Sequence, residues 1–358
     1  MTNPRARLIA FYLPQYHPIP ENDAWWGKGF TEWTNVRQAR PLFSRHYQPH
    51  IPGELGYYDL RDPNVRQAQA DLARTFGIYG FCYYHYWFNG KLLLERPFNE
   101  VLASGKPELP FCLCWANENW TRAWDGQHSE LLIGQNYSIE DDREHMRWLA
   151  RAFHDERYIR VNGKPMFIVY QTAQLPNPCR TAEVWREEAR RVGIGDIYLC
   201  KVESFRDDHR APEDIGFDAA IEFQPDTKRL LTPFEKAYWR IAQPFRLRQG
   251  ALAVDYAKFA ERAMQRPQPA YRRMPCVTPA WDNTARRKQG AFLLNRAAPE
   301  LYREWLTATI GRFTPPSADE NFVFINAWNE WAEGNHLEPD QKWGRGYLEA
   351  TRRALLER

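Results

Sequence analysis

The sequence has no long apolar segment, little net charge and no targeting pattern near its N-terminus. Its 358 residues carry a formal net charge of +3, whereas bulk nucleic-acid binding requires a strongly basic domain. No segment has the length of apolar residues needed to span a membrane, and Pro14 interrupts the first apolar run. We therefore expect a cytoplasmic protein that has no nucleic-acid partner.

Several catalytic and metal-binding motifs are also missing. The six cysteines include no C-x-x-C pair, and most lie in apolar runs, where free cysteine behaves as a small hydrophobic residue in a reducing compartment. There is no G-x-S-x-G nucleophile elbow and no glycine-rich phosphate loop before a helix. The spacing of His17, His85 and His336 matches no metal motif. We expect neither a metal nor another cofactor.

What the sequence does contain is a series of eight short apolar runs. They are nearly continuous in apolar residues rather than alternating, which is typical of parallel strands buried on both faces. The runs span Leu8–Leu13, Ile78–Tyr84, Pro110–Trp115, Pro165–Tyr170, Ile197–Val202, Ala219–Phe223, Pro275–Ala280 and Phe322–Ala327.

Helical patterns lie between these runs, so strand and helix alternate along the chain. The alternation predicts an α/β fold, a single (β/α)8 TIM barrel formed by one domain over residues 1–358. Long connections follow the first and sixth strands, at Pro14–Asp62 and Gln224–Ala253, and long loops of this kind are usually binding loops or lids. The helical patterns span Pro63–Phe76, Asp141–Phe153, Thr181–Val192, Asp255–Gln265, Pro299–Arg312 and Gly346–Leu356.

Two carboxylates three residues apart, Glu330 and Glu333, follow the last predicted strand within the sequence N-E-W-A-E-G. Paired acids beside indole rings suit sugar chemistry. One acid protonates a leaving oxygen, the second carboxylate handles the other proton or the anomeric centre, and the indole covers the apolar face of a sugar ring. An isolated N-E-x-x-E is more often a solvated loop, but the ends of the other strands favour the catalytic interpretation.

Residues that can bind hydroxyls or stack on sugar rings follow every predicted strand. In a barrel of this kind the carboxyl ends of the strands and the loops after them form the active site. We therefore predict a substrate-binding set made of Tyr12, His17, Trp33, Tyr84, His85, Trp87, Trp115, Asn117, Glu118, Asn119, Trp120, Gln171, Glu222, Trp281, Asp282, Asn329, Trp331 and His336.

Six segments carry a resemblance to a known family. They are residues 10–33, 80–88, 114–126 (CWANENWTRAWDG), 163–170, 279–287 (PAWDNTARR) and 327–340 (AWNEWAEGNHLEPD). The chain resembles the WbsX-like proteins of bacterial polysaccharide clusters, which are related to family 99 glycoside hydrolases, retaining endo-α-mannosidases and mannanases.

The resemblance implies a role for each acid. Glu330 corresponds to the base that takes the proton of the sugar 2-hydroxyl, and Glu333 to the general acid. Cleavage would then retain the anomeric configuration through a 1,2-anhydro sugar. We expect a glycoside hydrolase or transglycosylase that acts on an oligosaccharide or polysaccharide. The alternative is a glycosyltransferase of cell-surface polysaccharide biosynthesis on the same barrel, and a third reading is an inactive carbohydrate-binding protein.

The segment 228–248 combines basic residues with aromatic ones. Its composition is that of an interfacial helix, so contact with an anionic membrane or a lipid-linked glycan is one reading, and an ordinary surface helix or lid is the other. Because it follows the sixth strand, we expect it at the rim of the active site.

Overall fold

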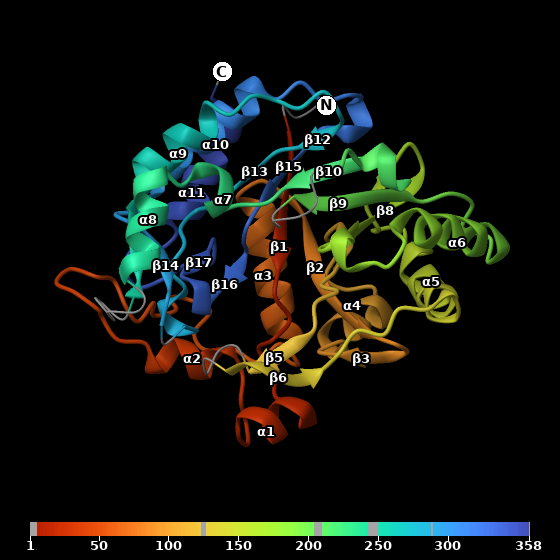
Figure 1. Cartoon of the computed structure of the whole chain (residues 1–358), viewed down its shortest axis with the longest axis horizontal. Helices are drawn as coiled ribbons and strands as arrows, with labels where there is room; N and C mark the ends of the chain where they lie inside the picture. Colours follow the sequence, from red (N-terminus) through yellow and green to blue (C-terminus); the bar gives the residue numbers. More distant parts are fainter. Residues whose placement is uncertain (1–5, 123–126, 204–209, 243–249, 288, 358) are drawn as a thin grey trace.

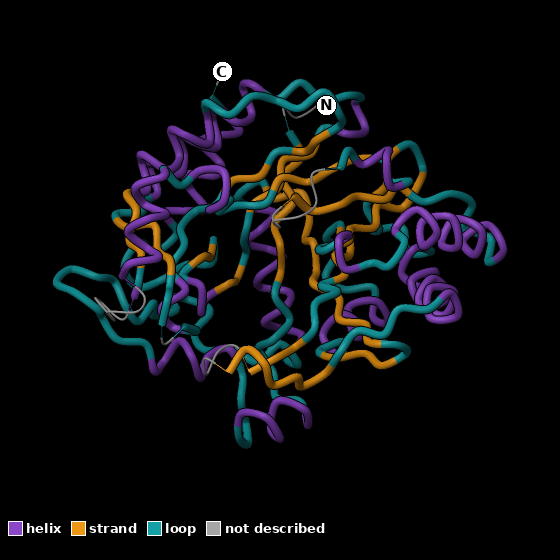
Figure 2. The backbone as a smooth tube through the Cα atoms, viewed as in Figure 1, coloured by secondary structure: helices purple, strands orange, loops and turns teal. Residues whose placement is uncertain are grey.

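The computed structural model describes residues 6–122, 127–203, 210–242, 250–287 and 289–357. The strands gather in the middle of the molecule, and the helices lie around them on the outside (Figures 1 and 2). None of the described helices is both long enough and apolar enough to cross a membrane.

The central sheet is a parallel barrel that closes on itself. Along the sheet the strands follow the order β12-β10-β9-β8-β4-β2-β1-β15-β13. Its two outermost strands, β12 (Arg273–Met274) and β13 (Cys276–Val277), are halves of one strand separated by Pro275, which has no amide hydrogen to donate. Since β12 pairs with β10 and β13 pairs with β15, this interrupted strand joins the two edges.

The barrel therefore has eight strand positions, as the sequence predicts. Each of the eight apolar runs forms a strand, because continuous apolar residues satisfy both the barrel interior and the helices packed outside. The seventh is the least regular, since its hydrogen bonding stops at Val277 and not at Ala280. The other barrel strands are β1 (Arg7–Tyr12), β2 (Ile78–Phe88), β4 (Phe111–Trp115), β8 (Lys164–Val169), β9 (Tyr198–Glu203), β10 (Ala219–Glu222) and β15 (Phe322–Ile325).

The helices that cover the barrel agree closely with the helical patterns of the sequence. Those patterns correspond to α3 (Pro63–Thr75), α5 (Ile139–Phe153), α6 (Pro178–Arg191), α9 (Tyr256–Met264), α10 (Pro299–Arg312) and α11 (Gly346–Leu356). Helix α3 begins as its sequence indicates, since the Asp62 side chain accepts a hydrogen bond from the Asn64 amide and Pro63 occupies the first turn. Helices that the patterns did not predict are α1 (Pro20–Trp26), α2 (Glu32–Gln38), α4 (Arg96–Ser104) and α7 (Thr227–Leu230). Helix α8 (Pro233–Ala242) lies within the segment 228–248, for which a helix was one expectation.

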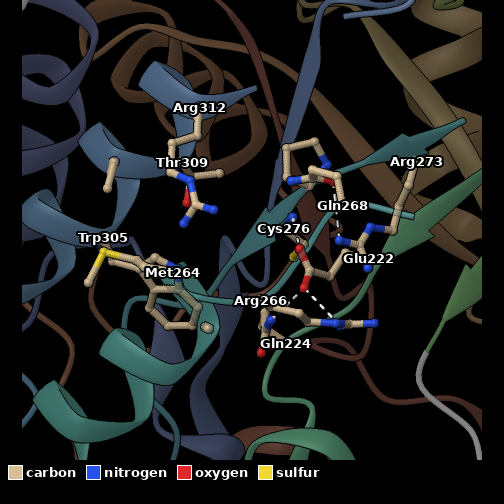
Figure 3. Close-up of a pocket in the computed structure, with 13 residues that line it drawn as sticks. Glu222, Gln224, Met264, Arg266, Gln268, Arg273, Cys276, Trp305, Thr309 and Arg312 are labelled. Atoms are coloured by element: carbon tan, nitrogen blue, oxygen red, sulfur yellow. Dashed lines mark hydrogen bonds and ion pairs between the residues drawn. The ribbon is translucent and has the colours of Figure 1, made fainter. Parts of the chain in front are cut away.

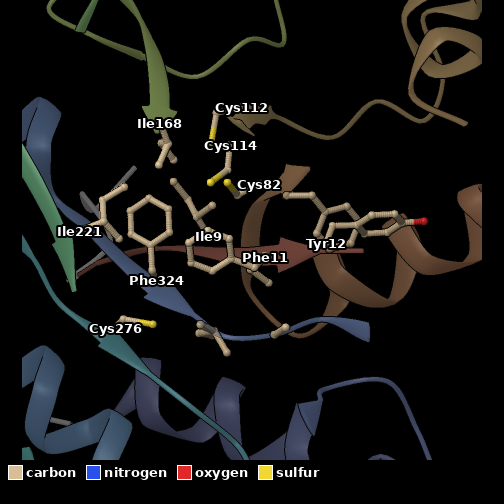
Figure 4. Close-up of a cluster of buried hydrophobic side chains, with 14 of the residues drawn as sticks. Ile9, Phe11, Tyr12, Cys82, Cys112, Cys114, Ile168, Ile221, Cys276 and Phe324 are labelled. Atoms are coloured by element: carbon tan, nitrogen blue, oxygen red, sulfur yellow. The ribbon is translucent and has the colours of Figure 1, made fainter. Parts of the chain in front are cut away.

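The barrel interior is filled by side chains that alternate along each strand. Figure 4 shows Ile9, Phe11 and Phe324 meeting in the interior, while Tyr12 points away from them. The Phe11 ring lies 5.5 Å from Phe324 and 5.3 Å from Phe223. These rings close the middle of the barrel, so a ligand can enter only from an end.

Short strands outside the barrel form small hairpins and paired segments in the loops. Helices α1 and α2 and the hairpin of β5 and β6 lie at the end toward which β1 runs (Figure 1). This is the end where all barrel strands finish, because the barrel pairs are parallel. The additional strands are β3 (Lys91–Leu93), β5 (Trp120–Arg122), β6 (Gln127–Ile133), β7 (Arg160–Val161), β11 (Leu252–Asp255), β14 (Phe292–Asn295), β16 (Asn329–Glu330) and β17 (Asn335–His336).

Candidate active site

The two predicted acids lie on a tight turn beyond β15. Strands β16 and β17 pair antiparallel, and a short 3-10 turn over Trp331–Glu333 joins them. Gly334 closes this turn in the left-handed region, with φ of 55°. A Cβ atom at Gly334 would lie 2.9 Å from the Asp282 Cβ, so the turn packs directly against the loop after β13.

Arg286, in that neighbouring loop, contacts both acids and a third carboxylate. Its guanidinium nitrogens lie 2.8 Å from Glu330, 2.8 Å from Glu333 and 3.1 Å from Glu32. The Glu32 side chain has no exposed surface, and that of Arg286 is 12% exposed. A buried guanidinium with three carboxylates around it leaves the cluster two negative charges in excess when all three acids are ionised. We call these four residues the acid cluster.

Burial and mutual repulsion favour a proton in the acid cluster. Burial raises the pKa of Glu330 to about 8, and the charges of Glu333 and Glu32 act in the same direction while Arg286 opposes them. Burial also raises the pKa of Glu32, and Arg286 again opposes the shift. Because the groups interact strongly, the proton belongs to the cluster as a whole. Both raised pKa values favour a proton held between Glu330 and Glu32.

A cavity of about 440 Å³ opens beside the acid cluster. Its walls combine flat rings with carboxylate, amide and guanidinium groups, the mixture that small-molecule sites use to orient a ligand. Among the predicted residues it is lined by Tyr84, Glu118, Asn119, Trp120, Trp281, Glu330 and Glu333, together with Gln15, Asn22, Trp26, Tyr86, Tyr170, Phe223, Arg286 and Arg287.

Glu118 gives this cavity another acid with a shifted pKa. Burial raises the pKa of Glu118 to about 7, and the charge of Glu333 adds to the shift, while a hydrogen bond donated by the Gln171 amide opposes it. Asn119 beside it accepts a hydrogen bond from the Gln135 amide at 2.7 Å. The loop after β4 therefore presents polar groups that can bind hydroxyls.

Strand alternation places four predicted aromatic residues outside the cavity. Along β2, Tyr84 and Tyr86 face the cavity, so His85 and Trp87 face outward toward α5. There His85 lies 2.9 Å from His145, and the Trp87 indole donates to Asp141. By the same alternation Trp115 packs edge-to-face against His145 and Trp185, and the Tyr12 hydroxyl donates to Gln69. The expectation that His85 and Trp115 line the subsite is wrong for this reason.

Two predicted asparagines fasten neighbouring strand ends to each other. The Asn329 amide accepts from the Leu13 nitrogen at 2.7 Å and donates to the Leu13 carbonyl at 3.0 Å. Asn117 makes the equivalent pair with the backbone of Gln171, at 2.8 and 2.9 Å. These amides are occupied by backbone groups, so they hold the rim of the barrel rather than face a ligand.

The remaining predicted residues have other partners. Glu222 points toward Arg266, 3.1 Å away, in the barrel wall between α9 and α10 (Figure 3). Its neighbour Phe223 faces the cavity instead. The other predicted residues do not line the cavity. The His17 ring lies within hydrogen-bond distance of the Pro14 carbonyl, and the Trp33 indole donates to the Tyr58 carbonyl. The Asp282 carboxylate bonds to His46 and Gln48, the Trp331 indole donates to Glu338, and His336 lies against His50.

The sequence reasoning did not single out Arg286, although it lies in the quoted segment 279–287. A charge argument could have found it, because acids gathered at the buried end of a barrel need a nearby cation. Glu32 and Trp26 belong to the loop expected at this end of the barrel but were not in the predicted substrate-binding set, and Asn22 was missed. They lie in the long connection after β1, and only the fold shows that this connection covers the cavity.

The chain matches a known family along almost its whole length. A family model described as glycosyltransferase WbsX matches residues 8–351. Two curated proteins, each named uncharacterized protein WxcX and each from Xanthomonas campestris pv. campestris, are 46% identical over 351 residues, or 98% of this chain. The chain spans about half the length of these relatives, 50% of each.

Solved structures share the barrel at low sequence identity. The structure of the GH99 endo-alpha-mannosidase from Bacteroides thetaiotaomicron gives a TM-score of 0.60 at 15% identity, covering 97% of this chain and 96% of that one. A structure described as a glycoside hydrolase-like protein gives a TM-score of 0.61 at 14% identity, covering 99% and 95%. At these identities the likeness establishes the fold.

Proposed function

Since this chain belongs to the family described as glycosyltransferase WbsX, we propose that it is an enzyme acting on glycosidic bonds, with Glu330 and Glu333 as its catalytic acids. The observation that carries the proposal is the acid cluster at the wall of a 440 Å³ cavity, at the carboxyl end of a parallel barrel. The substrate is an oligosaccharide or polysaccharide. We propose a retaining reaction, either hydrolysis or transfer to a sugar acceptor.

The reaction needs one acid that gives a proton and one that takes one. In the proposed route a carboxylate removes the proton of the sugar 2-hydroxyl, whose oxygen attacks the anomeric carbon, and the bond to the leaving oxygen breaks. The second acid protonates that oxygen. Water or a sugar hydroxyl then opens the 1,2-anhydro ring and gives its proton to the second carboxylate, while the first carboxyl group returns its proton to the 2-oxygen.

The protonation of the free site bears on which acid does which task. The family resemblance makes Glu330 the base, yet the raised pKa of Glu330 leaves it protonated near neutral pH. Glu330 can serve as base only if substrate binding moves the cluster's proton onto Glu333. With the opposite assignment no such transfer is needed. The two assignments are therefore distinguishable by experiment, because they place the proton of the substrate complex on different acids.

Trp120 and Trp281 are the residues we propose as the sugar platform. Both indoles line the cavity, and indoles stack on the apolar face of pyranose rings. Glu118 and Asn119 would bind hydroxyls, and Gln171 would orient Glu118 through their hydrogen bond. Tyr84, whose ring stacks on Phe11 with centroids 5.7 Å apart, closes the deep end of the subsite.

A glycosyltransferase is the second candidate, favoured by the family description itself. The two candidates differ in the donor. A hydrolase or transglycosylase cleaves an oligosaccharide, whereas a sugar-nucleotide-dependent transferase needs a nucleotide-linked sugar. An inactive carbohydrate-binding protein would be the third reading, and it would bind glycan without turnover.

The test is a donor panel read by product analysis. Purified protein is incubated with defined oligosaccharides and, separately, with UDP- and GDP-sugars plus glycan acceptors, and the anomeric configuration of the first-formed product is followed by proton NMR. Release of a retained product from an oligosaccharide, lost in the Glu333→Gln variant, supports the proposal. Turnover of sugar nucleotides alone would replace it with the transferase, and binding without turnover with the third reading.

We also propose that helix α8 touches an anionic membrane. Three side chains spaced along one side of α8 are exposed: Phe234 at 79%, Tyr238 at 38% and Ile241 at 59%. Residues 228–242 are not among the residues that line the cavity. Its basic residues are partly engaged, since Lys236 donates to the Lys228 carbonyl. Residues 243–248 of the predicted segment lie outside the described residues.

A further inference from the structure

A second cavity lies behind the turn that carries the two acids. Its volume is about 180 Å³, and its walls include His50, His336, Asp340 and Gly334. His336 follows Glu333 by three residues on β17, whereas His50 comes from the long connection after β1. The fold thus brings together two histidines and an aspartate that are separated by almost three hundred residues. All three side chains are buried.

The donor atoms of these residues converge. One ligand atom from each lies within 4.8 Å of those of the other two. The Nδ1 atom of His50 lies 2.9 Å from Nε2 of His336. Two imidazole nitrogens bound to one zinc ion lie about 3.4 Å apart, given bonds of about 2.1 Å at a tetrahedral angle, so the rings need to separate by only about 0.5 Å.

The orientation of His336 is that of a metal ligand. Its Nδ1 atom lies 2.9 Å from the carbonyl oxygen of Glu338, which can only accept, so this nitrogen carries the proton. The lone pair is thereby fixed on Nε2, the atom that faces His50. Metal-binding histidines almost always donate their second ring nitrogen to such a carbonyl or carboxylate. The ring is further held by stacking on Trp331, with centroids 3.7 Å apart.

Asp340 completes the set and is itself held in place. Its carboxylate accepts from the Trp343 amide at 2.5 Å and from the Tyr47 hydroxyl at 3.4 Å. The nearest cation in the lining is Lys342, which lies over the Tyr47 and Trp343 rings at 4.4 and 4.7 Å.

We propose that His50, His336 and Asp340 form a binding site for a divalent transition-metal ion, of which Zn²⁺ fits the donor set best. Two imidazole nitrogens and one carboxylate oxygen are donors that Zn²⁺ accepts, with water filling the fourth position from the cavity. On binding, the proton that His50 Nδ1 donates to His336 Nε2 moves to Nε2 of His50, so the two facing nitrogens both offer lone pairs to the ion and both rings stay neutral. The sequence did not predict this site because His50 belongs to no recognisable spacing with His336.

The ion would have a structural role, because it would join two segments of the chain without contacting the sugar. His336 pairs across β17 and β16 with Asn329, the residue before Glu330. A Cβ atom on Gly334 would meet His50 Nε2 at 3.2 Å, so the first connection already presses against the turn. Binding of metal at His50 and His336 would therefore tie that connection to the turn carrying the acids. The inference does not depend on which glycan the enzyme uses.

The test measures metal binding directly. Full-length protein is stripped with a chelator, and Zn²⁺ binding is followed by equilibrium dialysis with metal analysis, supported by the visible spectrum of the Co²⁺ form. The expected result is one ion per chain and a rise in melting temperature. In Asp340→Asn and in His50→Gln binding should weaken by about 100-fold or more, since even indirect partners of metal ligands contribute about 10- to 100-fold. His154→Gln, an exposed histidine at the end of α5, is the matched control and should bind as the parent does.

Two results would overturn the proposal. One is failure of the unmodified protein to bind Zn²⁺ or Co²⁺ stoichiometrically, a measurement that requires no variant to fold. The other is unchanged affinity in both Asp340→Asn and His50→Gln, which would place the ion elsewhere. Folding of the variants is checked by circular dichroism before titration. Glycan turnover is not a readout here, so this test and that of the proposed function can fail separately.

Discussion

Replacing Arg286 with methionine should make the free energy of unfolding depend more steeply on pH. Methionine keeps much of the side-chain volume and removes the guanidinium that Glu32, Glu330 and Glu333 share. The buried Glu32 and Glu330 and the half-buried Glu333 then lack their counter-ion. Rather than remain charged, they take up protons, because an unpaired buried charge costs more than neutralising it.

The size of the effect follows from the contacts. With charge centres roughly 4 Å apart and an effective dielectric constant of about 20, each carboxylate loses about 4 kcal/mol of attraction, or about 3 pKa units. The pKa of Glu330, already about 8, moves higher, and the cluster holds one or two more protons near neutral pH than it does in the parent. Each extra proton makes the free energy of unfolding fall by about 1.4 kcal/mol per pH unit while the unfolded chain is ionised.

The sign is fixed by the direction of the shift. A carboxyl group whose pKa is raised on folding stabilises the protein below its unfolded value near 4.5 and loses that contribution as pH rises through the folded value. The parent should therefore lose stability between pH 4.5 and about 8 through Glu330, and Arg286→Met should lose it more steeply. The variant is closest to the parent near pH 5 and furthest from it at pH 8.

The assay is urea unfolding at a series of pH values between 5 and 8. The control is Arg345→Met, which removes an exposed guanidinium bound to Glu54 and should leave the pH dependence unchanged. The reasoning would be refuted if Arg286→Met and the parent differed by a constant amount at every pH. Adding Glu32→Gln to Arg286→Met removes one titrating group. The double variant should therefore lose about 1.4 kcal/mol less unfolding free energy per pH unit than Arg286→Met.

Three further outcomes are expected. Glu330→Gln and Glu333→Gln should each lower turnover by about 10²–10⁴-fold with the fold intact. Glu330→Gln should also reduce the loss of stability with rising pH. Wild-type turnover in both variants would refute the assignment of these two acids. In initial-rate assays, Trp120→Ala should raise KM about tenfold. The control is Trp185→Phe, which changes a buried indole outside the cavity and should leave KM unchanged. Equal effects of the two substitutions would refute the proposed sugar platform. Liposome co-sedimentation should show binding to anionic but not neutral vesicles, reduced by Phe234→Ser with Ile241→Ser; no difference between vesicle types discards the membrane contact.

The architecture was accessible from the sequence because strand and helix patterns depend on local periodicity. Eight apolar runs each longer than a turn could hardly be anything but strands between the helical patterns, and the (β/α)8 prediction is confirmed. The helices inside the first long connection, α1 and α2, were missed. Helix α1 is only seven residues long and begins among prolines, so it shows little periodicity of its own.

The site was harder to predict because strand ends do not reveal which way each side chain faces. In β2 the Tyr84 side chain faces the cavity, and that of the next residue, His85, faces α5. From the sequence alone both are plausible ligand contacts. Only the register decides between them. Arg286 illustrates a second difficulty, since its partners Glu32 and Glu330 come from opposite ends of the chain and no local pattern connects them.

The backbone around the acids is fixed so firmly that their main remaining freedom is the placement of a proton. The Trp328 amide donates to the Phe11 carbonyl at 2.8 Å, the Asn329 amide grips both backbone groups of Leu13, and the Asp282 amide donates to the Glu333 carbonyl at 2.5 Å. The first two contacts join the segment after β15 to the end of β1, and the third joins the turn to the loop after β13. A substrate that enters such a site changes charge and solvation more than position. Catalysis here should therefore depend on how the ligand redistributes the cluster's proton between Glu330 and Glu333, with Arg286 setting the range of pH over which one proton is held.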